Sequence, residues 1–155
     1  EERQQIRGDA RSIIENKQVE VKTAIDAVKG KVKQKFSEAA QTSVANITDR
    51  LTGTVDNLSA IATRIDSRIS VLQASSTNMD ASVALLTVAR ADIAAAQDKI
   101  TAVGAALSAA LASATPKNEM PKIRAAVKAA EDAIKTAKDS LKAALDSVKA
   151  ATINH

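Results

Sequence analysis

The stretch VANITDRLTGTVDNLSAIATRIDSRISVL, residues 44–72, decides the fold class. An apolar residue recurs in it every seven positions, and a second apolar row follows four residues behind the first. The two rows are Val44, Leu51, Leu58, Ile65 and Leu72, and then Val55, Ala62 and Ile69. Because this spacing brings both rows to one face of an α-helix, it predicts a helix that packs lengthwise against other helices.

The same pattern returns twice, after turn-like polar segments at 73–78 and 113–118. The next two heptad rows are Met79, Leu86, Ile93, Ile100 and Leu107, and then Met120, Val127, Ile134, Leu141 and Val148. Their companion rows are small: Ala89, Ala96, Val103 and Ala110, and then Ala130, Ala137, Ala144 and Ala151. Large residues opposite alanine let helix axes approach closely, at the cost of a thin core.

Connections this short make neighbouring helices antiparallel. Residues 42–155 are therefore predicted to form an antiparallel, coiled-coil-like three-helix bundle, with helices at about 42–73, 79–113 and 117–152. Thr115 suits the cap of the last helix, and Pro116 suits its first position.

The first 41 residues carry a further apolar stripe, formed by Ile14, Val21, Ile25, Val28, Val32 and Phe36. The stripe keeps phase with the row that begins at Val44, and no proline interrupts it. We therefore expect residues 1–41 to be an N-terminal helical extension that runs into the first bundle helix and overhangs the bundle. The alternative is a hinge near Gln41-Thr42-Ser43, which would fold the extension back into a four-helix bundle.

Composition excludes several classes of function. The 155 residues include 33 alanines and one phenylalanine, with no tyrosine, tryptophan or cysteine. The chain therefore has no disulfide, no thiolate metal site, no cysteine nucleophile and no aromatic platform for stacking nucleic-acid bases. The basic run Lys29–Lys35 has acidic neighbours and the net charge is only +4, so nucleic acid is a disfavoured partner.

Nothing in the sequence predicts catalysis. The only histidine is residue 155, so no histidine or cysteine can activate the many serines and threonines. A Glu-x-x-His pair, which builds metal sites in helical bundles, is missing as well. We expect a protein that is not an enzyme, with no catalytic, cofactor-binding or metal-binding residues.

The sequence predicts no membrane span, because the longest low-charge run, Ile100 to Ala114, has 15 residues and a span needs about 20 apolar ones. No signal peptide is present in this chain. A membrane surface is a less favoured partner, because the stripe of the extension is narrow and carries a single phenylalanine.

The helices resemble a group of uncharacterised, alanine-rich, exported helical proteins of candidate-phyla (Parcubacteria-like) bacteria. The resemblance covers most of the chain, and the middle helix of this chain is less charged than in the group. The matching residues are Ile47, Arg50-Leu51, Leu58, Ile61, Arg64-Ile65, Ser67-Arg68-Ile69, Leu72, Ala89-Arg90, Ile93, Ala114-Thr115-Pro116-Lys117, Ile123-Arg124, Val127-Lys128 and Ala130. The resemblance implies an extracellular or cell-envelope location and carries no known activity.

These observations predict a non-enzymatic structural or protein-interaction protein that assembles with itself through its N-terminal helix. The predicted self-association residues are the six of the stripe: Ile14, Val21, Ile25, Val28, Val32 and Phe36. The expected product is a homo-oligomer or a filament, and an unknown protein partner is also open. The alternative is an amphipathic coat protein on a lipid or polymer surface, comparable to phasins or apolipoproteins.

Overall fold

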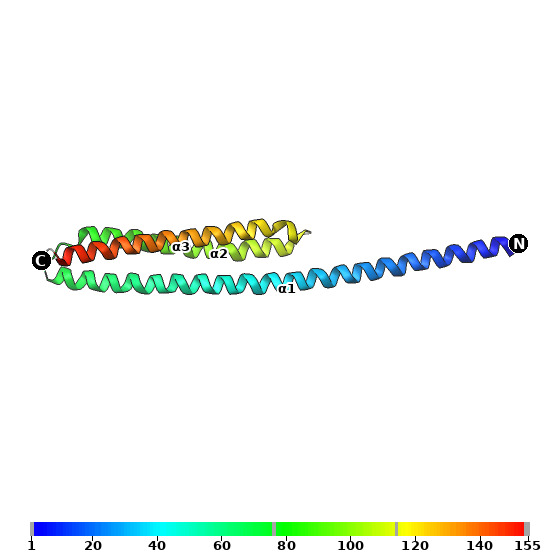
Figure 1. Ribbon diagram of the computed structural model, residues 1–155, viewed down its shortest axis with the longest axis horizontal. Helices are drawn as coiled ribbons and strands as arrows, with labels where there is room; N and C mark the ends of the chain where they lie inside the picture. The colour runs from blue at the N-terminus through cyan, green and yellow to red at the C-terminus, as the bar shows by residue number, and fades with distance from the viewer. Residues whose placement is uncertain (1, 76, 114, 154–155) are drawn as a thin grey trace. The chain divides into compact units, whose positions relative to one another are not determined.

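The computed structural model describes residues 2–75, 77–113 and 115–153, with side chains from residue 12 onward. Three helices make up the fold: α1 (Glu2–Ala74), α2 (Asp80–Ala112) and α3 (Pro116–Ile153) (Figure 1). The described residues include no strand. The predicted all-α fold is thus confirmed, and the helix ends differ from the predicted ones by about one residue.

The chain divides into two compact units, Glu1–Gln41 and Thr42–His155. Helix α1 belongs to both units, and residues 41–43 are helical. The four-helix alternative needs a helix end at these residues, and α1 has none there. Gly30 and Gly53 also lie within α1, with open space where a side chain would stand. Each lowers helix stability by about 1 kcal/mol relative to alanine without ending the helix.

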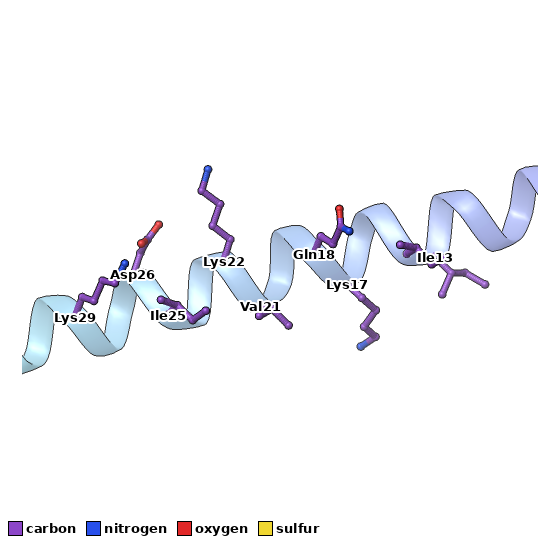
Figure 2. A pocket seen from close by; sticks show the side chains of 9 residues that line it. Ile13, Lys17, Gln18, Val21, Lys22, Ile25, Asp26 and Lys29 are labelled. Atoms are coloured by element: carbon purple, nitrogen blue, oxygen red, sulfur yellow. The ribbon is translucent and has the colours of Figure 1, made fainter.

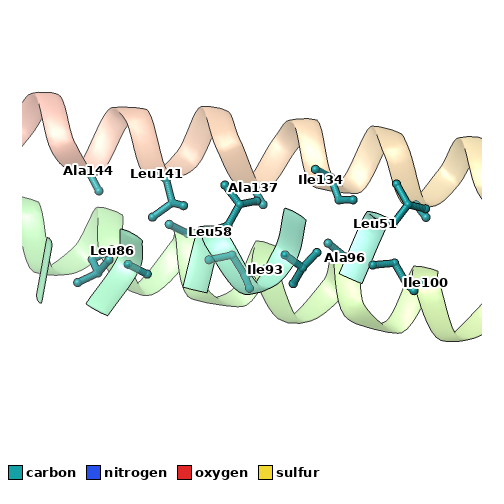
Figure 3. Packing of buried hydrophobic residues seen from close by; sticks show 14 of the residues in the cluster. Leu51, Leu58, Leu86, Ile93, Ala96, Ile100, Ile134, Ala137, Leu141 and Ala144 are labelled. Carbon is teal, nitrogen blue, oxygen red and sulfur yellow. The ribbon is translucent and has the colours of Figure 1, made fainter. Parts of the chain in front are cut away.

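The second unit is a three-helix bundle in which α2 runs antiparallel to α3 and to the second half of α1 (Figure 1). Its core consists of the predicted heptad rows. Val55 from α1, Val103 from α2 and Ala137 from α3 are completely buried. Figure 3 shows the large residues Leu86, Ile93 and Ile100 of α2 in the buried cluster with Ile134 and Leu141 of α3. The half-buried members of the rows lie at their ends or next to them: Leu72, Leu107, Met120, Val127 and Ala151.

Alanine alternates with these large residues in the core. Ala89, Ala96, Ala130, Ala137 and Ala144 have no exposed surface. A side chain of one carbon leaves room for the large residue of the neighbouring helix, so the helices pack closely without aromatic side chains. The core of the bundle thus consists mainly of methyl groups and aliphatic side chains.

Backbone and asparagine contacts form the connection between α1 and α2. The Thr77 N–H donates to the Leu72 carbonyl at 3.1 Å and closes the C-terminal turn of α1. The Asp80 N–H donates to Asn78 Oδ1 at 3.0 Å, which satisfies one of the free N–H groups at the start of α2. Helix α3 begins at Pro116 as predicted, because a proline has no N–H to leave unsatisfied there.

Pro121 lies inside α3, a position that the sequence analysis did not consider. A proline in a helix removes one backbone hydrogen bond and crowds the preceding turn. The helix continues through it, and Ile123 two residues later is buried in the core. The cost of the proline falls in the first two turns of α3, next to the connection from α2.

Candidate interaction surface

The six predicted association residues lie on one side of α1, and we call this set the α1 apolar face: Ile14, Val21, Ile25, Val28, Val32 and Phe36. Five of them are exposed, from 47% for Ile25 to 62% for Val32, and Phe36 is half-buried. All described side chains from 12 to 35 are exposed. A row of this size that faces solvent is unusual for a soluble helix and marks a contact surface.

Lysines border the α1 apolar face on both sides. Lys17 lies three residues after Ile14 and four before Val21, so it adjoins both side chains on the helix surface. Lys29 lies four residues after Ile25 and adjoins it on the other edge. Figure 2 shows Lys17 and Lys22 projecting in opposite directions from the helix, along the open strip that these residues line. The apolar face is therefore a narrow strip with lysines on both edges, and Asp26 also lines it.

Two polar contacts within α1 involve the acidic residues Glu20 and Glu38. The ammonium group of Lys17 lies 2.7 Å from Glu20 Oε2, and both side chains are more than two-thirds exposed. Gln34 Nε2 donates to Glu38 Oε1 at 3.0 Å. Exposed contacts of this kind contribute little to stability. Replacement of these contacts by contacts with a partner would therefore cost little free energy.

Two exposed apolar residues escaped the sequence analysis. Ile13 is 61% exposed and lines the same open strip, and Val19 is 65% exposed. Both lie off the helical repeat of the α1 apolar face, and a search by periodicity passes over such residues. A wheel projection, which assigns each residue an angle on the helix, places Ile13 beside the strip.

A second, smaller groove lies between α1 and α3 within the bundle. Its walls include the exposed side chains of Ile61 and Leu145, with Ile65 and Val148 buried below. Arg64 and Arg68 also line it, one helical turn apart and both exposed. The sequence analysis did not identify this groove, because it depends on which sides of two distant helices meet.

Polar contacts between α2 and α3 offer no catalytic arrangement. The Ser140 hydroxyl donates to Asp92 Oδ2 at 2.5 Å, and the Ser82 and Ser147 hydroxyls lie 2.8 Å apart. A serine needs a base such as histidine to become a nucleophile, and His155 lies outside the described residues. Within the described ranges, no group of three His, Cys, Asp or Glu residues could hold a metal ion.

Among the described residues, no helix has an apolar stretch long enough to cross a bilayer. Comparison with protein-family models, curated proteins and solved structures finds no match for this chain. The resemblance to candidate-phyla proteins therefore stays a prediction from the sequence.

Proposed function

We propose that the protein is a non-enzymatic structural or interaction protein that associates with itself through the α1 apolar face. One observation carries the proposal: five of the six side chains of that face are 47–62% exposed to solvent, whereas the apolar rows of the second unit are buried. A helix gains most of its stability in water by covering an apolar face. A second helix packed against this face would bury the apolar side chains that are exposed in the single chain.

The energy at stake is adequate for association. Complete burial of an exposed valine or phenylalanine contributes roughly 1.5–3 kcal/mol. Val21, Val28 and Phe36 from two copies together reach the order of the roughly 4–15 kcal/mol that association costs in lost freedom of motion. The remaining isoleucines and Val32 add to this sum. We therefore expect a homo-oligomer at micromolar protein concentration.

The test is the double substitution Val28→Glu/Phe36→Glu. Two charges on the α1 apolar face should prevent its burial, so sedimentation should show monomers where the wild type shows oligomers. The matched control is Ala27→Glu/Gln34→Glu, which adds the same charge on the other side of α1. It should leave the oligomer intact, and circular dichroism should show the same helix content for all three proteins. A wild type that sediments as a monomer at high concentration would contradict the proposal.

An amphipathic coat on an anionic lipid surface is the second candidate, and the lysines that border the strip favour it. Lys17, Lys22 and Lys29 could reach lipid phosphates while Val21 and Ile25 enter the interface. Flotation with vesicles of anionic lipid separates the two candidates. Recovery of the wild type with the vesicles, and of Val28→Glu/Phe36→Glu without them, would support the coat.

We also propose an extracellular or cell-envelope location. The support is the resemblance to exported helical proteins, together with the lack of cysteine in the chain. Fractionation of cells that express the full natural protein tests it, and recovery from the cytoplasm alone would contradict it.

A further inference from the structure

We infer that the groove between α1 and α3 binds an acidic amphipathic helix of another protein, with the apolar side chains of that helix on Ile61 and Leu145. The groove lies in the second unit, away from the α1 apolar face, so the inference goes beyond the proposed self-association. Its basis is a set of exposed apolar side chains whose charged neighbours are all basic.

Exposed apolar side chains gather on this side of the bundle. Ile61 of α1 is 42% exposed and Leu145 of α3 is 37% exposed, and both line the groove. Val71 is 57% exposed and lies ten residues after Ile61, which places it about 80° from Ile61 around the helix. Among the other described residues of the bundle up to position 152, only Val83 and Val88 of α2 are large, apolar and exposed. The side with the groove therefore has the larger share of exposed apolar residues.

The charged residues that adjoin these three side chains are all basic. On a helix surface, the neighbours of a residue lie three and four positions away from it. No aspartate or glutamate occupies such a position next to Ile61, Val71 or Leu145. The charged residues that do, which we call the basic rim, are Arg64, Arg68, Lys142 and Lys149. All four are exposed, and the two arginines line the groove itself.

The carboxylates of α3 lie farther from the groove than its lysines do. The two lysines of the basic rim are about 40–60° from Leu145 around the helix, whereas Asp139 and Asp146 are about 100–120° from it. Asp146 Oδ1 lies 3.8 Å from the ammonium group of Lys149, and both side chains are more than half exposed. Such a pair contributes little to stability and can be exchanged for another.

The rest of the basic rim has no ion pair. Among the residues that the structure describes, no carboxylate pairs with either arginine of the rim or with Lys142. Asp66, which is near both arginines in the sequence, pairs instead with Arg90 of α2 at 2.9 Å. Carboxylates of a partner would therefore find positive charges that the bundle leaves unpaired.

An acidic amphipathic helix fits this surface. A helix that lies along the groove places its apolar side chains on Ile61 and Leu145. Its two edges then lie over the two walls, so acidic residues on one edge meet the arginines and those on the other meet the lysines. The strip from Ile61 to Val71 measures about 15 Å on a rise of 1.5 Å per residue, which is the length of roughly three helical turns.

Other occupants fit this groove less well. The α1 apolar face of a second copy has lysines on both edges, which would face the basic rim. Nucleic-acid bases would find no aromatic ring, since the chain has one phenylalanine, at position 36, and no tyrosine or tryptophan. A flat lipid surface would meet the long basic side chains before Ile61 and Leu145, which are more than half covered.

Fluorescence anisotropy with a labelled peptide tests the charge requirement on the full chain. The probe is a synthetic helix of about 14 residues, with leucines three and four positions apart and glutamates on both sides of them. It should bind at least 10-fold more tightly than the same peptide with glutamine in place of glutamate. Arg64→Gln/Arg68→Gln should weaken its binding about 10-fold. The control Lys99→Gln/Arg124→Gln removes the same charge elsewhere on the bundle and should have little effect.

A second pair of variants tests the apolar part of the groove. Leu145→Ser should weaken binding of the glutamate peptide several-fold, because it removes apolar surface from the groove. The matched control is Val88→Ser, at an exposed position of α2, which should leave the affinity unchanged. Circular dichroism verifies that all variants remain folded. Equal affinities for the glutamate and glutamine peptides, or equal effects of Leu145→Ser and Val88→Ser, would overturn the inference.

Competition experiments identify the other occupants. If single-stranded DNA or anionic vesicles bind the wild type, lose binding with Arg64→Gln/Arg68→Gln, and the glutamate peptide does not bind, the inference is wrong and the basic rim serves that anion. If Arg64→Gln/Arg68→Gln dissolves an oligomer seen in sedimentation, the occupant is a second copy, which also overturns it. A wild type that is monomeric but binds the glutamate peptide would contradict the proposed self-association and leave this inference intact.

Discussion

Val28 and Val55 lie on the same helix and belong to similar apolar rows, yet one is 60% exposed and the other is completely buried. The residue type and the helix are the same, so the difference lies in the partner rows. Val55 belongs to the unit that contains α2 and α3, and Val28 belongs to the unit Glu1–Gln41. A heptad row therefore identifies the face of a helix that seeks a partner, and the rest of the chain decides whether that partner is present.

The largest expected difference between the two regions comes from removal of a large apolar side chain. Leu58→Ala should lower the free energy of unfolding by about 2–5 kcal/mol, because Leu58 is 6% exposed and its loss leaves a cavity in the bundle. Val28→Ala should change it by less than about 0.5 kcal/mol in dilute, monomeric protein. Urea unfolding followed by circular dichroism measures both. Equal losses would mean that Val28 is buried by the same chain.

The alanine rows offer the opposite change, an increase in volume. Ala137→Leu should destabilise the bundle by about 1–3 kcal/mol, because Ala137 has no free surface and its neighbours would have to move. Ala94→Leu, at an exposed position of α2, is the control and should have little effect. If Ala137→Leu leaves the stability of the bundle unchanged, the helices can move apart without loss of stability. That result would contradict the close packing described above. The melting temperatures of the two variants decide the matter.

Polar groups should also behave differently in the two regions. Ser82 is 1% exposed and its hydroxyl lies 2.8 Å from that of Ser147, so Ser82→Ala should cost about 0.5–1.5 kcal/mol. Thr23 bonds to the Val19 carbonyl at 2.9 Å on the exposed part of α1, and Thr23→Ala should be nearly neutral. The double variant Ser82→Ala/Ser147→Ala should regain most of the loss, because no hydroxyl is then left without its partner. Additive losses in a double-mutant cycle would argue against the hydrogen bond.

The smallest expected effect is a gain. Gly53→Ala should stabilise the bundle by about 0.5–1 kcal/mol, since the position is helical and nothing lies near the added methyl group. Gly30→Ala should increase helix content in the first 41 residues and leave the unfolding midpoint of the bundle unchanged. Hydrogen exchange resolved along the chain distinguishes these outcomes. A midpoint shifted by Gly30→Ala would show that the two units unfold together.

Much of the fold could be predicted from the sequence, because the pattern that determines it is local and repeated. The rows from Val44 to Leu72 and from Met79 to Leu107 predicted both the helices and their buried sides. The turn before Pro116 was predicted because proline, which has no backbone N–H, suits the first position of a helix. Three features could not be predicted in this way. Pro121 continues a helix because tertiary packing overrides its propensity, and the contacts Ser140–Asp92 and Ser82–Ser147 depend on the rotation of two helices about their axes.

The candidate surface was predictable in part for the same reason. Periodicity located the α1 apolar face from Ile14 to Phe36, and five of its six residues are exposed. It missed Ile13, because the residue seven positions later is Glu20 and no apolar row continues from Ile13. It also missed the groove at Ile61 and Leu145, since two residues 84 positions apart meet only when their helices are side by side. Whether the face binds a second copy stays a prediction.

The scarcity of aromatic residues has a practical consequence for spectroscopy. Phe36 is the only phenylalanine of the protein, which has no tyrosine or tryptophan, and it belongs to the α1 apolar face. The bundle core, built from aliphatic side chains, therefore gives no aromatic signal of its own. Any aromatic ring resonance in a nuclear magnetic resonance spectrum, apart from that of the single histidine, comes from the face proposed to bind a partner. The chain thus carries a natural label at the place where self-association has to be observed.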